Sequence, residues 1–253
     1  MLKLEHINLV RTNAYYRVET FRSLFVQSLM SPLKSITEKP VTEFFLKDIN
    51  IEIRPGERIA FLGRNGGGKS TLCRLVAGQL MPSSGTIGND HRVSLFSQLE
   101  TSFYRELTGR ENLRFFMKFI YRDCSDTEQA RLLAKAEEFS ELGQKLDRAV
   151  ETYSTGMISR LALSLILARP HDLLILDEMQ NYADAPFRAK VAERLSRVIE
   201  SSNIVIVVSH HEDDLVAVCT RGVVIEGGSI VFDGPIEKAK AFYKLTFPEV
   251  RNA

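Results

Sequence analysis

A glycine-rich segment that ends in a lysine and two hydroxyl residues carries the clearest chemistry in this sequence. Glycine N–H groups can turn inward around a phosphate because no Cβ stands in the way. A lysine at the end of such a loop brings positive charge to the outer phosphates, and the hydroxyl after it can ligate Mg²⁺. The segment fits the phosphate-loop pattern G-x-x-x-x-G-K-[ST] at every fixed position, and its residues are Gly63, Arg64, Asn65, Gly66, Gly67, Gly68, Lys69, Ser70 and Thr71.

The flanking segments have the character that a phosphate loop needs. Residues 58–62 predict a buried strand, and residues 71–80 place four aliphatic side chains on one side of a predicted helix. A strand before the loop and a helix after it give the setting in which the motif binds a nucleotide, and the helix N-terminus adds its positive end. The alternative interpretation is a glycine-rich turn that fits the pattern by chance.

Two adjacent acids end a second apolar strand. Residues 173–176 are continuous aliphatics, typical of a parallel strand covered on both faces, and Asp177 and Glu178 follow them. A carboxylate there can reach a Mg²⁺ ion, and an adjacent acid that does not hold the metal can orient or deprotonate the attacking water. The alternative interpretation is a surface acid pair at the end of a strand.

Two further polar residues follow predicted strands. Gln98 comes just after the strand predicted at 93–96, and His210 follows the strand predicted at 204–209. Open α/β sheets bind ligands at the carboxyl edge of their strands, so both side chains are candidates for the site. A histidine there is more often a structural surface residue, and His211 leaves the choice between the two histidines open.

A small polar turn at a predicted helix start and one loop acid complete the candidates. Ser154, Thr155 and Gly156 form a turn that can bind an anion at the helix N-terminus, or can be a plain helix cap. Asp184 lies seven residues after Asp177, in the loop that leaves the strand. The alternative interpretation of Asp184 is a solvated loop acid.

The remaining pattern predicts an α/β core that carries a helical insertion. Alternating residues at 2–7 and 45–53 predict half-buried strands of an antiparallel edge sheet. Capping signatures and apolar stripes at helical spacing predict a helical subdomain at about 97–168. Residues 223–232 predict a hairpin with a Gly-Gly turn. We expect a single domain over 1–253.

Composition narrows the function classes. The chain has 253 residues, 44% of them hydrophobic and 26% charged, as in soluble globular proteins, and the net charge of +1 gives no reason to expect nucleic-acid binding. No apolar run approaches the roughly 18 residues of a spanning helix, and the N-terminus does not resemble a signal peptide. Three widely spaced cysteines, Cys73, Cys124 and Cys219, favour a reduced, cytosolic compartment without a metal cluster.

Taken together, the order and spacing of these motifs resemble those of an ABC-transporter ATPase over nearly the whole chain. Three shorter segments, at 107–113, 138–143 and 153–162, resemble more narrowly the ATPases of bacterial exporters of capsule, O-antigen and teichoic acid. The resemblance implies a P-loop NTPase fold, ATP hydrolysis and Mg²⁺. No aromatic stands near Arg11, where such relatives place the residue that stacks on adenine, so Tyr15 or Tyr16 becomes the candidate.

The resemblance also assigns roles to single residues. It implies that Asp177, Ser70 and Gln98 hold the metal, that Glu178 is the catalytic base and that His210 is the switch histidine. It implies that Asp184 is the D-loop acid, and that Ser154 and Gly156 bind the γ-phosphate of ATP held by a second subunit.

The partners implied are a second copy of the chain and an ABC-2 type permease that carries a lipid-linked polysaccharide, at the cytoplasmic face of the bacterial inner membrane. Export of a lipid or drug is the alternative, and a non-transport ABC ATPase or a catalytically dead scaffold are further rivals. The chain lacks the paired ATPase units, long coiled coils or basic stripe of the non-transport types, and the presence of Glu178 and His210 argues against dead chemistry.

An aromatic segment next to Gln98 suggests where the permease docks. Part of it must form the core of the helical subdomain, and the rest could line a groove for a short permease helix. We expect a charged rim around that groove from Arg105, Glu106, Arg110 and Glu111. The aromatics are Phe103, Tyr104, Phe115, Phe116, Phe119 and Tyr121.

Overall fold

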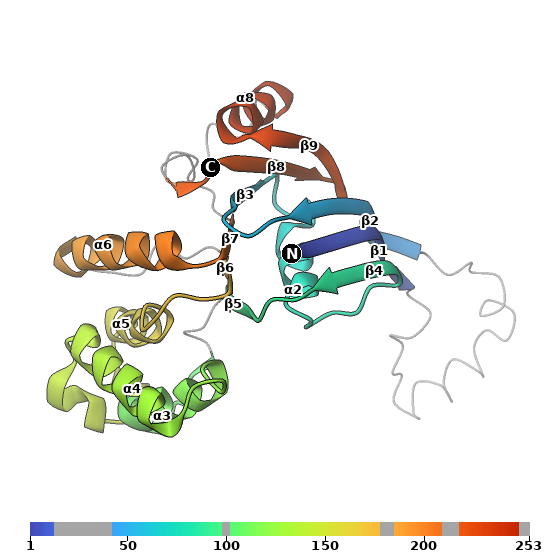
Figure 1. Ribbon diagram of the computed structural model, residues 1–253. Helices are drawn as coiled ribbons and strands as arrows, with labels where there is room; N and C mark the ends of the chain where they lie inside the picture. Colours follow the sequence, from blue (N-terminus) through green and yellow to red (C-terminus); the bar gives the residue numbers. More distant parts are fainter. Residues whose placement is uncertain (13–41, 98–101, 178–184, 209–217, 248–253) are drawn as a thin grey trace, which may run out of the picture.

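The computed structural model describes residues 1–12, 42–97, 102–177, 185–208 and 218–247 (Figure 1). The described strands form two sheets, one of three strands and one of six, and helices cover the larger sheet. The predicted α/β core with an antiparallel edge sheet and a helical insertion is confirmed.

The six-stranded sheet has the order β5-β6-β7-β3-β8-β9. Its first five strands run parallel, and β9 pairs antiparallel with β8 through the predicted Gly-Gly hairpin. β6 is buried along its whole length, because helices cover one face of this aliphatic strand and a helix and the second sheet cover the other. The strands are β5 (Val93–Ser97), β6 (Leu173–Asp177), β7 (Ile204–Val208), β3 (Arg58–Leu62), β8 (Arg221–Glu226) and β9 (Ser229–Pro235).

The smaller sheet is antiparallel, in the order β2-β1-β4. β1 (Leu2–Thr12) and β2 (Thr42–Ile53) were predicted but run longer than the alternating pattern. β4 (Ser84–Asn89) was not predicted, since its sequence holds two glycines and one aliphatic residue and its strand character comes from pairing with β1.

The first residues of the helices agree more closely with the predicted capping residues than with the apolar stripes. Thr108 closes the predicted capping box with Glu111, and the Ser125 hydroxyl accepts the Glu128 N–H at 3.2 Å. The helices are α2 (Lys69–Val76), α3 (Gly109–Ile120), α4 (Asp126–Ser140), α5 (Thr155–Ile166), α6 (Ala185–Ser201) and α8 (Ile236–Thr246), with short 3₁₀ turns η4 (Gly143–Asp147) and η5 (Val150–Thr152).

The core lies in layers on the two faces of the large sheet. α2 and the smaller sheet lie on one side of the large sheet, and α5 and α6 lie on the other (Figure 1). Leu173 and Ile175 of β6 pack in the first layer, whereas Leu174 and Leu176 pack in the second. Successive side chains of β6 thus point to opposite faces of the sheet, so that α2 packs on one face and α5 on the other. α3, α4 and α5 share a further core of their own, as expected of a helical subdomain. Among the described residues, no helix combines the length and apolar character that crossing a membrane requires.

Candidate nucleotide-binding site

The carboxyl ends of four parallel strands meet at one edge of the large sheet. Phe61 of β3 and Asp177 of β6 both pair with Val208 of β7, and Ser97 of β5 pairs with Asp177. Phe61 and Asp177 are therefore two strands apart, about 10 Å at the usual strand spacing. The phosphate loop begins at Gly63, so this register brings the loop and the acid to the same edge.

Lys69 is held over the phosphate loop rather than in solvent. It is only 6% exposed, and its ammonium donates to the carbonyl oxygens of Gly63 at 2.7 Å and Arg64 at 2.9 Å. A charge-assisted pair of hydrogen bonds fixes a flexible side chain far better than solvent does. The positive charge is thus placed at the centre of the loop.

The start of α2 differs from the sequence prediction in a way that matters for the site. We expected the helix at 71–80, but it begins at Lys69 and ends at Val76. Lys69 and Ser70 therefore occupy its first turn. Gly68, the N-cap residue, has φ 112°, a conformation that favours glycine, and it has no side chain with which to cap the helix. The first N–H groups of α2 are thus left to an anion such as a phosphate.

The residues present fit a Mg²⁺ ion held jointly with phosphates. Asp177 is 7% exposed at the end of β6, and Ser70 is half-buried in the first turn of α2. β6 packs against α2, and burial together with the Asp177 charge raises the pKa of the Cys73 thiol of that helix well above its usual range. Mg²⁺ commonly takes one or two protein oxygens and completes its shell with phosphates and water.

The described residues hold no group of three or more histidines, cysteines or acids that could bind a metal by themselves. A Mg²⁺ ion at this edge of the sheet would be shared with the phosphates of a nucleotide. Asp177 and Ser70 would hold such an ion, and its charge would offset that of the phosphates.

Several predicted site residues lie outside the described residues. They are Gln98, Glu178, Asp184 and His210, together with Tyr15 and Tyr16. The structure places the residues next to some of them: Ser97 and Asp177, which precede Gln98 and Glu178, pair with each other. β7, the strand before His210, ends at Val208 beside Asp177. The roles of these residues stay predictions.

Ser154 lies at the start of α5, away from the phosphate loop of its own chain. Its hydroxyl accepts the Met157 N–H at 3.3 Å and caps α5, and the anion-binding role of this turn stays a prediction. α5 packs on the face of β6 opposite to α2. Ser154 is exposed, and a Cβ added to Gly156 would meet no described atom within 4 Å, so the turn is open to a partner.

The aromatic segment divides into core and surface as expected. Phe103, Phe116 and Tyr121 are buried, whereas Tyr104, Phe115 and Phe119 are exposed, Phe119 by 72%. A groove of about 420 Å³ runs between β5 and α3, and Phe116, Phe119 and Ile120 line its helical side. The groove adjoins the strand that ends one residue before Gln98.

The prediction of a charged rim around this groove is partly wrong. Arg110 pairs with Glu137 and with Asp147, and Glu111 closes the capping box with Thr108. These charges therefore stabilise the helical subdomain rather than ring the groove. The arginines beside the groove are instead Arg92 and Arg122.

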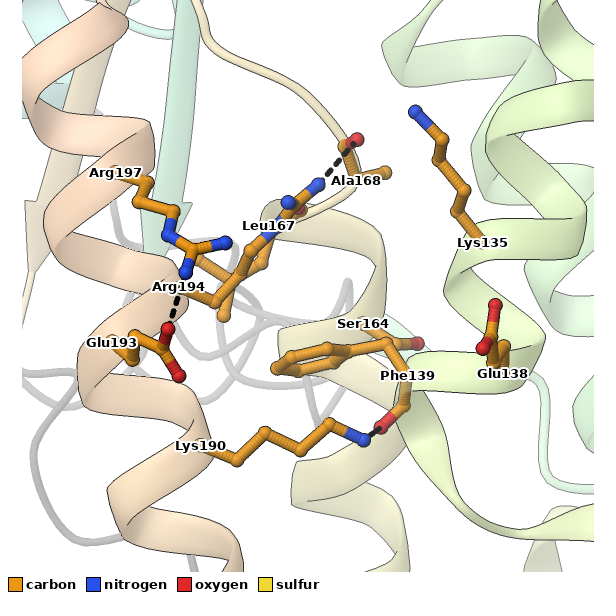
Figure 2. Close-up of a pocket in the computed structure, with 10 residues that line it drawn as sticks. All are labelled: Lys135, Glu138, Phe139, Ser164, Leu167, Ala168, Lys190, Glu193, Arg194 and Arg197. Carbon is orange, nitrogen blue, oxygen red and sulfur yellow. Dashed lines mark hydrogen bonds and ion pairs between the residues drawn. The ribbon is translucent and has the colours of Figure 1, made fainter.

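A second cavity, of about 320 Å³, lies between α4, α5 and α6 (Figure 2). The three cations that α6 contributes, Lys190, Arg194 and Arg197, are engaged within the chain. Arg194 donates to the Leu167 and Ala168 carbonyls beyond the end of α5, at 3.0 and 3.3 Å, and Lys190 donates to Glu141 at 2.6 Å. Cations near the last carbonyls of a helix stabilise it. We therefore assign these side chains to joining α6 with α4 and α5.

Removing the Lys69 ammonium should weaken nucleotide binding. We expect Lys69→Ala to raise the dissociation constant for Mg-ATP by about tenfold to a hundredfold, since a hydrogen bond to a charged group contributes about 1.5–3 kcal/mol. Arg74→Ala is the matched control, because Arg74 is an exposed cation in the last turn of the same helix. Equal dissociation constants for the two variants, both folded by circular dichroism, would contradict this role for Lys69.

The sheet order, the phosphate loop at the carboxyl edge and the acid two strands away define a phosphate-loop nucleoside-triphosphatase. Comparison with known proteins narrows the class. Residues 46–181 match the family model described as ABC transporter. The chain belongs to the ABC transporter family.

Several named proteins are similar in sequence to most of the chain. The O-antigen export system ATP-binding protein RfbB of Klebsiella pneumoniae is 33% identical over 199 residues, which span 79% of this chain and 80% of the relative. The polysialic acid transport ATP-binding protein KpsT of Escherichia coli is 36% identical over 79% of this chain and 90% of the relative. Among solved structures, the dimeric post-hydrolysis state of an ATP-binding cassette bound to ADP and Pi aligns with a TM-score of 0.70 at 18% identity, over 93% of this chain and 99% of that one.

Proposed function

We propose that this chain is the ATP-hydrolysing subunit of an exporter that moves a lipid-linked surface polysaccharide, such as capsule or O-antigen, across the bacterial cytoplasmic membrane. The observation that carries the proposal is the likeness, over most of the chain, to ATP-binding proteins named for export of O-antigen, polysialic acid, capsule polysaccharide and teichoic acid. The chain acts at the cytoplasmic face of the membrane, as a peripheral subunit. An exporter of lipid or drug is the alternative cargo class.

The nucleotide site supports the hydrolysis of ATP to ADP and phosphate. Backbone N–H groups of the loop and the Lys69 ammonium bind the phosphates, and Asp177 and Ser70 hold the Mg²⁺ that offsets their charge. Glu178 takes the proton of the attacking water. Both remaining residues act from the ends of the neighbouring strands. His210 contacts the γ-phosphate, and Gln98 contacts the metal or the water.

Two copies of the chain complete two such sites. The Ser154 turn lies on the opposite face of β6 from α2, and its side chains are exposed, so it is available to the phosphate loop of a second copy. A helix N-terminus with a hydroxyl cap suits the γ-phosphate of the ATP held there. The dimer thus needs ATP to bring its surfaces together.

The permease docks in the groove between β5 and α3. Exposed aromatic side chains in a groove with a charged surround are typical anchors for a short amphipathic helix. The groove lies beside β5, which ends one residue before Gln98 in the sequence, so we expect a nucleotide that moves Gln98 to move the docked helix as well. The membrane partner that we propose is an ABC-2 type permease.

Replacing Phe119 by alanine should uncouple the chain from its permease. We expect co-purification with the permease and surface polysaccharide to fall by about thirtyfold or more, because an aromatic anchor buried in the complex contributes about 2 kcal/mol or more. The ATPase rate of the isolated chain should stay near wild type. Leu245→Ala is the matched control, since Leu245 is 84% exposed on α8, away from the groove.

Normal export by the Phe119→Ala chain would place the docking site elsewhere. A matching loss of isolated ATPase activity would instead make Phe119 a structural residue of the helical subdomain. The double variant at Tyr104 and Arg105 extends the same test to the other exposed end of the aromatic segment.

The cargo class is tested by deleting the gene from its own bacterium. We expect surface polysaccharide to disappear and its lipid-linked precursor to accumulate inside the cell, with lipid composition and drug sensitivity unchanged. Unchanged surface polysaccharide, with altered lipid distribution or drug sensitivity, would favour the alternative cargo.

A further inference from the structure

The tight turn between β8 and β9 lies directly against the phosphate loop. The Gly228 N–H donates to the Gly67 carbonyl at 3.0 Å, and the Gly228 carbonyl accepts the Lys47 N–H of β2 at 2.7 Å. One residue of the hairpin is therefore bonded to the loop on one side and to the smaller sheet on the other. None of the chemistry described above uses this contact.

The hairpin and the loop approach each other backbone to backbone. A Cβ on Gly228 would lie 2.7 Å from the Phe45 carbonyl oxygen, and a Cβ on Gly63 would lie 2.1 Å from the Ile225 carbonyl oxygen. A Cβ on Gly67 would lie 2.9 Å from the same Ile225 oxygen. Real Cβ atoms do not approach backbone oxygens this closely, so no side chain fits on either side of the contact.

The bond to Gly228 fixes how the loop presents its N–H groups. A trans peptide is planar, with its C=O and its N–H pointing in opposite directions. The Gly67 carbonyl belongs to the same peptide as the Gly68 N–H, so a carbonyl held toward the hairpin turns that N–H away from it. The hairpin fills one side of the loop, and the phosphate must therefore approach from the side to which the Gly68 N–H points.

We propose that Gly228 is a positioning residue for nucleotide binding: the β8–β9 turn holds the Gly67–Gly68 peptide in the orientation that binds phosphate. The inference rests on the proposed ATPase function and adds to it a residue far along the chain from the loop. The hairpin and β2 act together, because the same glycine is bonded to both.

The neighbouring glycine of the turn provides a matched control. Gly227 and Gly228 have φ of 53° and 81°, so alanine strains the backbone at both positions. Only at Gly228 does the added methyl meet main-chain atoms, since no described atom lies within 4 Å of a Cβ on Gly227. A difference between the two variants therefore reports the close packing on β2 that holds the turn beside the loop, not the strain of the turn.

The test measures the dissociation constants of both alanine variants for Mg-ATP and Mg-ADP, below their melting temperatures. We expect Gly228→Ala to weaken binding by about tenfold or more and Gly227→Ala by less than about threefold, because the loop N–H groups are charge-assisted donors whose orientation matters. Equal dissociation constants, with only the melting temperature lowered in Gly228→Ala, would make Gly228 a purely structural glycine and overturn the proposal.

Hydrogen exchange on the wild-type chain gives a second test that needs no variant. Coupling between two sites is reciprocal, so Mg-ADP should slow the exchange of the turn at 226–229 as well as that of the phosphate loop. Protection of the loop alone would overturn the proposal even if Gly228→Ala does not fold. Failure of the wild-type chain to bind nucleotide would instead contradict the proposed function itself.

Discussion

Replacing Glu178 by glutamine should lower ATP turnover by about a hundredfold or more while leaving ATP binding near the wild-type value. The substitution removes the carboxylate that we propose as the base for the attacking water. Asp177, the proposed metal ligand at the end of β6, and the Lys69 ammonium over the loop remain in place. Phosphate release measures the turnover, and fluorescence of a labelled ATP measures the binding.

Glu200→Gln is the control for this variant, because Glu200 is an exposed acid on α6 and its side chain has no role in the site. It should hydrolyse ATP at the wild-type rate. If Glu178→Gln also retained the wild-type rate, the catalytic base would have to be another residue.

Replacing Ser154 by arginine should abolish the ATP-dependent dimer and, with it, nearly all hydrolysis. A large cation at the start of α5 should block the proposed approach of a second phosphate loop, and it replaces the hydroxyl that we propose to contact the γ-phosphate. The clearest background is Glu178→Gln, in which bound ATP persists. Light scattering with Mg-ATP should then show dimers for Glu178→Gln and only monomers for the double variant.

Ser125→Arg separates loss of the interface from loss of a helix cap. Ser125 caps α4 in the same way that Ser154 caps α5, by accepting a backbone N–H three residues on, and both are exposed. Each substitution should cost about 1 kcal/mol of stability as a lost cap. Only Ser154→Arg should prevent dimers, so equal dimerisation of the two variants in the Glu178→Gln background would refute the two-copy site.

The strands and the site edge could be predicted from the sequence because their signals are local. The aliphatic runs of β6 and β7 and the fixed positions of the phosphate loop need no knowledge of their neighbours. Parallel pairing then brings Asp177 to the edge that carries the loop, as expected for open α/β sheets. The helix cap at Ser154 could likewise be predicted, because serine is a common N-cap residue.

Other features depend on partners that lie far away in the sequence. β4 owes its strand conformation to β1, and its two glycines hide it from any periodic pattern. The helix after the loop begins at Lys69 because Gly68 takes a conformation that only the folded loop imposes. The contact between Gly228 and Gly67 joins residues of a predicted hairpin and a predicted loop, but nothing in either segment shows that they meet.

The most direct test of the account is export in a strain that lacks the chromosomal gene and carries either the wild-type chain or Glu178→Gln, at equal abundance. Surface polysaccharide is measured by antibody or by composition of the washed cell surface. If ATP hydrolysis by this chain drives export, the wild-type chain restores surface polysaccharide, and the Glu178→Gln chain leaves it inside the cell on its lipid carrier. Full restoration by the Glu178→Gln chain would contradict the account.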